Sequence, residues 1–348
     1  MGYNSLIRFF TVQEAREMST SQTLDKHNTL IHNHQLSDLL RSIQSKIIGQ
    51  HHLIEYMLVG LLADGHILIE GMPGLAKTRS AKAIAEGVEG DFHRIQFTPD
   101  LLPSDLIGTE IYVHEKSNFI FRQGPLFHNI LLADEINRAP AKVQSALLEA
   151  MEEKQVTVGH KSYPLPELYM VIATQNPIEQ EGTYNLPEAQ LDRFMLHLEV
   201  DYPNHQEELR ILALDEERSM NSQSIPLAMT TKQQVLDARK VASSMFISEN
   251  LKNYVVSLVA ATRNPEKYDK KLASWLTHGA SPRATIALVR CAKVLTWLRG
   301  DEYVTPKHIH HLAAPILRHR IVPSFTSEAE GVRRNDIIQK LLEVVAIP

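Results

Sequence analysis

The segment Gly71-Met72-Pro73-Gly74-Leu75-Ala76-Lys77-Thr78 has the residue types and spacing of a phosphate-binding loop. Its glycines let the backbone curl, so that successive N–H groups face one point and can hold phosphate oxygens. The Lys77 ammonium could then contact the outer phosphates, while the Thr78 hydroxyl could hold Mg²⁺. One position departs from the usual pattern, because Ala76 stands where a glycine is common. We expect the alanine to fit there only with a negative φ.

Two adjacent acids, Asp134 and Glu135, follow the apolar run 130–133. Carboxylates at the tip of a buried strand are costly unless they serve a cation or a reaction. We therefore expect Asp134 to hold Mg²⁺ beside Thr78, and Glu135 to orient and deprotonate a water that attacks the terminal phosphate. The alternative is an ordinary helix-capping pair, and the order of the two motifs along the chain favours the catalytic interpretation.

Three further polar residues could complete such a site. Asn176 follows the apolar run 170–174 and could hydrogen-bond the attacking water, although an Asn before a proline is often only a turn residue. Arg193 follows the next short helical stretch, and Arg283 comes directly after Pro282, a residue typical of a helix start. An arginine at that end of a helix opposes the helix dipole, and a phosphate would explain its presence. Surface or salt-bridged arginines are the alternative for both.

The elements around these residues predict an α/β fold. The run 66–70 is typical of a buried strand, and 79–86 of a helix. Strands and helices then alternate to about residue 200, which indicates a parallel sheet flanked by helices, with two hairpins over 109–122 and 155–164. Beyond Pro203 only helical patterns remain, the last over 328–345. We expect a loosely ordered extension at 1–35, a nucleotide-binding domain at 36–203 and an all-helical domain at 204–348.

Composition narrows the class of protein. The 348 residues carry 36 Lys and Arg against 41 Asp and Glu, a net charge of −5, which is not the basic character usual in nucleic-acid binders. No stretch approaches 18 consecutive apolar residues, so no membrane span is expected. The single cysteine, Cys291, excludes an intramolecular disulfide and favours a reducing, cytoplasmic setting.

Several segments together resemble the AAA+ ATPases and, among them, the MoxR family, over roughly residues 36–320. The phosphate-binding loop with its alanine is similar to the variant loop of that family. The other matching segments are Ile48-Gly49-Gln50, Ala133-Asp134-Glu135-Ile136-Asn137-Arg138-Ala139-Pro140, Leu186-Pro187-Glu188-Ala189-Gln190-Leu191-Asp192-Arg193-Phe194 and Gly279-Ala280-Ser281-Pro282-Arg283-Ala284. The resemblance implies a P-loop AAA+ domain followed by a helical lid.

The resemblance also implies roles. Asn176 would be sensor 1, Arg193 the arginine finger that acts on a neighbouring subunit's nucleotide, and Arg283 sensor 2, while Ile48-Gly49-Gln50 would lie near the adenine. The ligands would be ATP and Mg²⁺, and the chain would form a homo-oligomeric ring, expected to be a hexamer. The family is associated with chaperone-like maturation of protein complexes, often with partners that carry a von Willebrand factor A domain.

Two other functions remain as alternatives. A DNA-dependent motor should carry basic hairpins, since phosphate contacts dominate DNA binding, but the hairpins here have mixed charge. A passive, nucleotide-controlled binding module would not need Glu135, Asn176, Arg193 and Arg283 together. The sequence therefore favours an ATPase that remodels a protein client and predicts no nucleic-acid partner.

Overall fold

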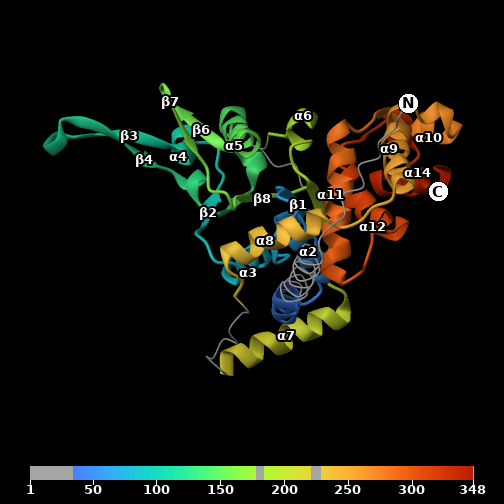
Figure 1. Cartoon of the computed structure of the whole chain (residues 1–348), viewed down its shortest axis with the longest axis horizontal. Coiled ribbons are helices and arrows are strands. Elements are labelled where there is room, and N and C mark those ends of the chain that lie inside the picture. Colours follow the sequence, from blue (N-terminus) through green and yellow to red (C-terminus); the bar gives the residue numbers. More distant parts are fainter. Residues whose placement is uncertain (1–33, 178–183, 221–228, 348) are drawn as a thin grey trace, which may run out of the picture.

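The computed structural model describes residues 34–177, 184–220 and 229–347. A five-stranded parallel sheet with the order β2-β5-β8-β1-β9 stands at its centre (Figure 1). Its strands are β1 (Ile67–Gly71), β2 (Phe92–Gln96), β5 (Ile130–Asp134), β8 (Met170–Gln175) and β9 (Leu196–Val200). Because every pairing is parallel, the carboxyl ends of β1, β5 and β8 meet at one edge, which is where open α/β sheets bind ligands.

Apolar side chains alternate between the two faces of the sheet. Ile67 and Ile69 pack toward α2 (His51–Leu62), α3 (Lys77–Gly87) and a helix at 34–46. Leu68 and Leu131 pack on the opposite face, toward α4 (Pro103–Ile107) and α5 (Ala141–Glu153). Burial on both faces explains why these strands are continuous apolar runs rather than alternating ones.

Two hairpins interrupt this alternation, as the sequence predicts. They consist of β3 (Gly108–Val113) with β4 (Asn118–Gln123), and β6 (Gln155–Val158) with β7 (Lys161–Pro164). The β3–β4 hairpin projects from the body as a long arm (Figure 1). The two hairpins meet where the Phe121 and Tyr163 rings lie 4.4 Å apart, centroid to centroid.

The remaining helices are one short helix between β8 and β9 and the series that follows β9. They are α6 (Glu188–Leu191), α7 (His205–Met220), α8 (Lys232–Ser243), α9 (Glu249–Arg263), α10 (Lys270–Trp275), α11 (Pro282–Arg299), α12 (Pro306–Leu317), α13 (Phe325–Ala329) and α14 (Arg334–Val344), with 3₁₀ turns η1 (His114–Lys116), η2 (Pro125–Phe127), η3 (Ile136–Arg138) and η4 (Pro265–Lys267). One apolar core runs from the α2 face of the sheet into these helices. The long helix α11 begins at the N-cap Ser281 and ends at Gly300, whose φ of +77° suits a helix end.

Some sequence expectations for this half were wrong in detail. The predicted last helix at 328–345 is two helices, α13 and α14, because Gly331 turns the chain with a φ of +71°. The helical half also contains a two-stranded ladder of β10 (Leu276–His278) and β11 (Val322–Pro323). The expected extension at 1–35 falls almost wholly on residues 1–33, outside the described part of the chain.

A buried histidine just before β1, His66, is expected to make stability depend on pH. The His66 Nε2 atom lies 3.2 Å from the Met151 carbonyl, and its Nδ1 atom accepts a hydrogen bond from the Val171 N–H. This arrangement suits only the neutral ring, and burial lowers the pKa of His66 to about 4. In the unfolded chain the ring takes up its proton near pH 6.5, so the folded state should lose stability as the pH falls from 6.5 toward 4.

We expect this histidine alone to lower the free energy of unfolding by about 2 to 3 kcal/mol between pH 7.5 and 4.5. Urea unfolding at both pH values should reveal the difference between wild type and His66→Gln, whose amide can keep both hydrogen bonds without titrating. Equal pH dependence in the two chains would contradict the assignment.

Candidate active site

The phosphate-binding loop joins β1 to α3, as expected, but its backbone differs from the prediction. Ala76 has a φ of +57°, so the expectation of a negative φ was wrong. A left-handed alanine costs roughly 1 to 2 kcal/mol, a strain that functional loops tolerate when the surrounding structure holds them. Gly74 also has a positive φ, and a Cβ added there would meet open space.

Lys77 begins α3 and points back across the carboxyl edge of the sheet. Its ammonium donates to the Gly71 carbonyl and to the Gln175 carbonyl, the latter at 3.2 Å. Burial lowers the pKa of Lys77, and the nearby charges of Asp134 and Glu135 oppose that shift. Lys77 is thus bound by carbonyl groups between the ends of β1 and β8, in reach of the loop's centre.

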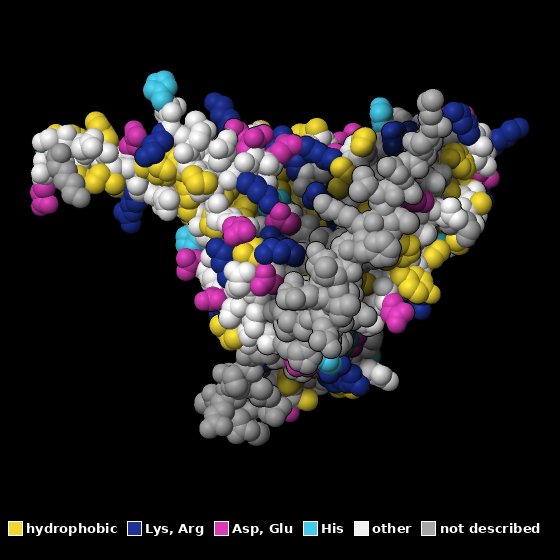
Figure 2. All heavy atoms as spheres, in the orientation of Figure 1, with side chains coloured by type: hydrophobic (Ala, Val, Ile, Leu, Met, Phe, Trp, Pro, Cys, Tyr) yellow, Lys and Arg dark blue, Asp and Glu magenta, His cyan; other side chains and the backbone are white. Residues whose placement is uncertain are grey.

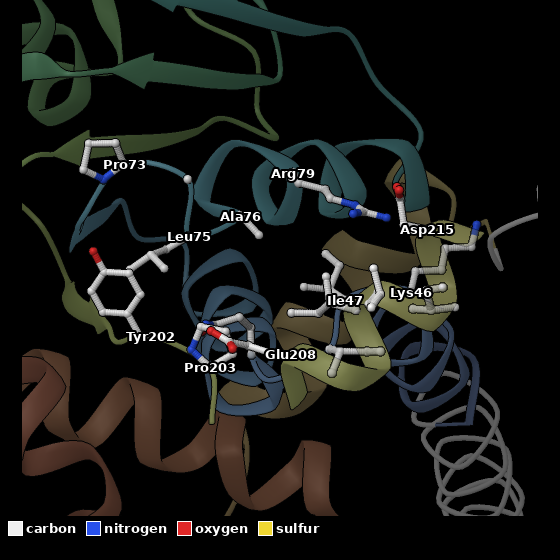
Figure 3. A pocket seen from close by; sticks show the side chains of 16 residues that line it. Lys46, Ile47, Pro73, Leu75, Ala76, Arg79, Tyr202, Pro203, Glu208 and Asp215 are labelled. Atoms are coloured by element: carbon white, nitrogen blue, oxygen red, sulfur yellow. The ribbon is translucent and has the colours of Figure 1, made fainter. Parts of the chain in front are cut away.

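A cavity of about 560 Å³ opens beside the loop (Figure 3). This volume is typical of small-ligand sites. Its lining residues come from the loop, from the turn after helix 34–46, and from the segment that runs from Tyr202 into α7; they are Lys46, Ile47, Ile48, Gln50, Pro73, Gly74, Leu75, Ala76, Arg79, Tyr202, Pro203, Glu208, Ile211, Leu212, Leu214 and Asp215. The apolar residues among them could hold a planar base.

The sequence identified only part of this cavity. Ile48 and Gln50 line it, whereas Gly49 turns the chain with a φ of +79° against the Glu207 side chain. The contribution of α7 and of Tyr202 was missed. Tyr202 lies near Leu75, while Arg79 and Asp215 lie at the opposite end of the cavity (Figure 3). The apolar residues that α7 leaves exposed, such as Leu212, were the feature that could have indicated its contribution to the cavity.

Asp134 lies directly beside the first turn of α3. Its Oδ2 atom accepts a hydrogen bond from the Thr78 hydroxyl at 3.1 Å and from Arg94 Nη2 at 2.7 Å, and its Oδ1 atom accepts from Thr174. The carboxylate and the Thr78 hydroxyl form the oxygen donor set that suits Mg²⁺. The predicted metal pair is therefore brought together, with the Arg94 guanidinium as an additional partner that the sequence did not reveal.

The Glu135 backbone is strained, and its carboxylate is held by hydrogen bonds. It has a φ of +59°, and its backbone N–H donates to Thr174 Oγ1 at 2.9 Å. Its Oε2 atom accepts from Gln96 Nε2 at 2.8 Å and from Arg138 Nη1 at 3.0 Å. Strain of this kind concentrates at functional sites, and these two donors hold the carboxylate of the predicted base at the edge of the sheet.

Asn176 follows the end of β8, next to the carbonyl that binds Lys77. Its own carbonyl accepts from Asn137 Nδ2 at 3.4 Å. The chain from 178 to 183 lies outside the described residues. The ends of three neighbouring strands thus bring Lys77, Glu135 and Asn176 to one edge, in the arrangement that the order of motifs predicts.

The two arginines lie together, but at a different place. Arg193 Nη2 contacts Glu152 Oε2 at 3.0 Å, and the Arg283 guanidinium bonds the other oxygen of Glu152. Neither arginine lines the cavity at the phosphate-binding loop; both line a second cavity that also includes Arg290 and Arg320. The sequence indicated neither this pairing nor the role of Glu152 at its centre.

Comparisons with known proteins agree with this architecture. A family model described as "ATPase family associated with various cellular activities (AAA)" matches residues 66–196, and one described as "AAA lid domain" matches 273–341. The chain is 43% identical to Chaperone MoxR1 of Mycobacterium tuberculosis, over 90% of this chain and 83% of that protein. This chain belongs to the MoxR family of AAA+ ATPases.

Other relatives support the same placement. The chain is 32% identical to the protein MoxR of Paracoccus denitrificans, over 88% of this chain and 93% of the relative. A crystal structure of a candidate ATPase from Cytophaga hutchinsonii superposes with a TM-score of 0.87 at 45% identity, over 94% of this chain and 99% of that one. The predicted family and the predicted fold, an AAA+ α/β domain with a helical lid, are thereby confirmed.

No helix of residues 34–177, 184–220 or 229–347 is long and apolar enough to cross a bilayer. The roles of individual site residues in this family member stay predictions.

Proposed function

We propose that this chain hydrolyses ATP with Mg²⁺ in a homo-oligomeric ring, a hexamer, and couples hydrolysis to chaperone-like remodelling of protein complexes in the cytoplasm. The observation that carries the ATPase part is the juxtaposition of the Thr78 hydroxyl and the Asp134 carboxylate, with Glu135 one residue further. Lys77 and the curled loop beside the 560 Å³ cavity supply the phosphate and base contacts.

Within one subunit, different residues bind the phosphates, hold the metal and activate the water. Lys77 and the loop N–H groups bind the phosphates, and Thr78 and Asp134 would hold Mg²⁺, which would neutralise charge on the transferred phosphoryl group. Glu135 accepts a proton from the attacking water, because it follows directly after β5 at the edge of the sheet that carries the phosphate-binding loop. To do so, its carboxylate must exchange the hydrogen bonds from Gln96 and Arg138 for one to that water.

Both arginines act on a neighbouring subunit in this proposal. Arg193 and Arg283 share Glu152 and lie outside the cavity of their own phosphate-binding loop. The Glu152 carboxylate bridges the two guanidiniums, and a phosphate oxygen of another subunit's nucleotide would bind in the same position. In this proposal Arg283, like Arg193, therefore acts on the nucleotide of the neighbouring subunit.

The β3–β4 arm supports a protein client. Its exposed side chains include Ile111, Tyr112, Phe119 and Ile120, with Phe119 61% exposed. Hydrophobic side chains line the projecting arm (Figure 2), and aromatic residues of this kind anchor protein partners. A client that carries a von Willebrand factor A domain, as the family resemblance implies, is part of the proposal.

The test that separates this function from a DNA motor is the ATPase rate with added duplex or single-stranded DNA, at low and at physiological salt. We expect a change of less than about twofold, because counterion release requires clustered basic residues and the arm offers acids such as Glu110 and Glu115. A several-fold, salt-sensitive stimulation would favour the motor. Absence of any Mg²⁺-dependent ATPase in the assembled protein would favour the passive binding module.

Arg94 leads to a prediction about metal binding. Its guanidinium donates to Asp134 Oδ2 through both Nε and Nη2, the oxygen that also contacts Thr78. A cation at this carboxylate must compete with that charge-assisted contact, worth about 1.5 to 3 kcal/mol. We expect Arg94→Met to lower the Mg²⁺ concentration for half-maximal binding of a fluorescent ATP analogue by roughly tenfold.

The matched control is Arg41→Met, which removes an exposed arginine whose nearest acid, Asp38, is also exposed. It should leave the Mg²⁺ requirement unchanged. An increased Mg²⁺ requirement in Arg94→Met would mean that Arg94 assists the metal rather than competing with it.

A further inference from the structure

The guanidinium of Arg320, just beyond α12, is buried and fully bonded. Its side chain is 2% exposed. All five N–H groups have acceptors: Nε donates to Asp192 Oδ1 at 2.7 Å, Nη1 to the carbonyls of Met195 and Ile316, and Nη2 to those of Asp192 and Phe194. Four of these five acceptors belong to residues 192–195, the short segment that carries Arg193.

Asp192 connects the same segment to the lid. Its Oδ2 atom accepts from the Ser281 hydroxyl at 2.8 Å. Ser281 is the N-cap of α11, and its Oγ atom accepts from the backbone N–H of Arg283 at 3.1 Å. One carboxylate therefore bridges the backbone next to Arg193 and the helix start that carries Arg283.

Stability alone does not explain this arrangement. Burying a charged pair is expensive, and well-packed apolar residues often replace such pairs without loss of stability. What the network supplies is position, since it fixes the main chain on both sides of the two arginines. Catalytic groups need such fixing, because a misplacement of about 1 Å can cost on the order of 10² in rate.

Glu152 cannot supply that precision during the reaction. It contacts the two arginines at their guanidinium ends, which must turn to a phosphate when they act. The network around Asp192 and Arg320 acts mainly through backbone atoms, the Asp192 carboxylate and the Ser281 hydroxyl. It reaches a guanidinium end through an ion pair of 4.0 Å between Arg283 Nη1 and Asp192 Oδ2.

We propose that Asp192 and Arg320 are positioning residues that fix Arg193 and Arg283 for action on the neighbouring subunit's nucleotide. The inference rests on the proposed function, namely that the two arginines act between subunits. It adds a connection through which the lid, by way of α11 and α12, sets the placement of both arginines.

The test uses the full chain with Asp192→Asn, an isosteric change that keeps a side-chain acceptor but weakens the pairing, and with Arg320→Met, which removes the donors. Both should bind a fluorescent ATP analogue within about twofold of wild type and hydrolyse ATP roughly 10- to 100-fold more slowly. The matched control is Arg299→Met, which removes a bidentate lid-to-core ion pair with Glu55. Its ATPase rate should stay within about twofold of wild type.

Mixing experiments distinguish a positioning role from damage to the variant's own nucleotide site. Asp192→Asn subunits should regain activity with Lys77→Ala subunits, which lack a nucleotide site but offer intact arginines. They should regain none with Arg193→Ala subunits, because neither partner then presents a placed arginine. The same pattern is expected for Arg320→Met.

The opposite pattern, recovery with Arg193→Ala but not with Lys77→Ala, would overturn the inference. So would an Asp192→Asn chain that hydrolyses ATP at the wild-type rate. A reference mixture of Lys77→Ala with Arg193→Ala tests the underlying proposal. If that mixture assembles without recovering, action between subunits is refuted, and the inference falls with it.

Discussion

Replacing Arg193 with alanine is expected to slow ATP hydrolysis by roughly 10³- to 10⁵-fold, the range that an arginine finger contributes in GTPases. The physical reason is the loss of a guanidinium that neutralises charge developing on the transferred phosphoryl group. Nucleotide affinity should change little, since Arg193 lies at Glu152 and not in the cavity beside its own phosphate-binding loop. Steady-state hydrolysis and binding of a fluorescent ATP analogue measure the two effects separately.

The decisive measurement is a mixture of Arg193→Ala with Lys77→Ala, two variants that should each be inactive alone. In a mixed ring, the Lys77→Ala subunit offers its arginine to the intact nucleotide site of the Arg193→Ala subunit, so part of the activity should return. Co-assembly must be verified by sedimentation of differently tagged subunits. Verified mixed rings that stay inactive would show that Arg193 does not serve a neighbouring site.

Replacing Glu135 with glutamine is expected to slow hydrolysis by roughly 10²- to 10⁴-fold while ATP still binds. An amide cannot accept the proton of the attacking water, yet it keeps the shape of the side chain and can still accept hydrogen bonds from Gln96 and Arg138. The fold should therefore persist. Single-turnover hydrolysis and equilibrium binding of labelled ATP test both halves of the prediction.

Two further variants serve as controls for Glu135→Gln. Lys77→Ala should lose ATP binding as well as hydrolysis, because the ammonium that reaches the phosphates is gone. Glu153→Gln changes an exposed glutamate at the end of α5 and should leave both properties unchanged. Hydrolysis by Glu135→Gln at the wild-type rate would remove Glu135 from the role of general base.

The sequence predicted most of the fold because its elements are locally specified. The central strands β1, β5 and β8 are continuous apolar runs, and each hairpin has a turn between two β-type segments, as at Gly159. The clustering of residues at the strand ends could also be predicted, because parallel strands must present their carboxyl ends at one edge of the sheet. This is why Lys77, Asp134 and Asn176 converge as expected.

The remaining features depend on contacts between segments distant in the chain. Nothing local to Arg94 indicates that β2 lies beside β5 and delivers a guanidinium to Asp134. Likewise, the pairing of Arg193 with Arg283 requires the lid to place the start of α11 against Glu152, a long-range packing result. The φ of Ala76 was wrong because an intrinsic preference of about 1 to 2 kcal/mol is small beside the packing of a whole loop.

The helix α5 joins the edge of the sheet that bears Glu135 to the pair of arginines around Glu152. It begins at Ala141, just after the turn that bears Glu135, and its Gln144 Nε2 atom donates to the Ile136 carbonyl at 3.2 Å. Its last turn carries Glu152. Thirteen residues of α-helix form a rod of about 20 Å. A tilt of this helix at the Glu135 end would displace the carboxylate that bridges Arg193 and Arg283. In the proposed ring, the state of each active site would then influence the timing of hydrolysis at the next.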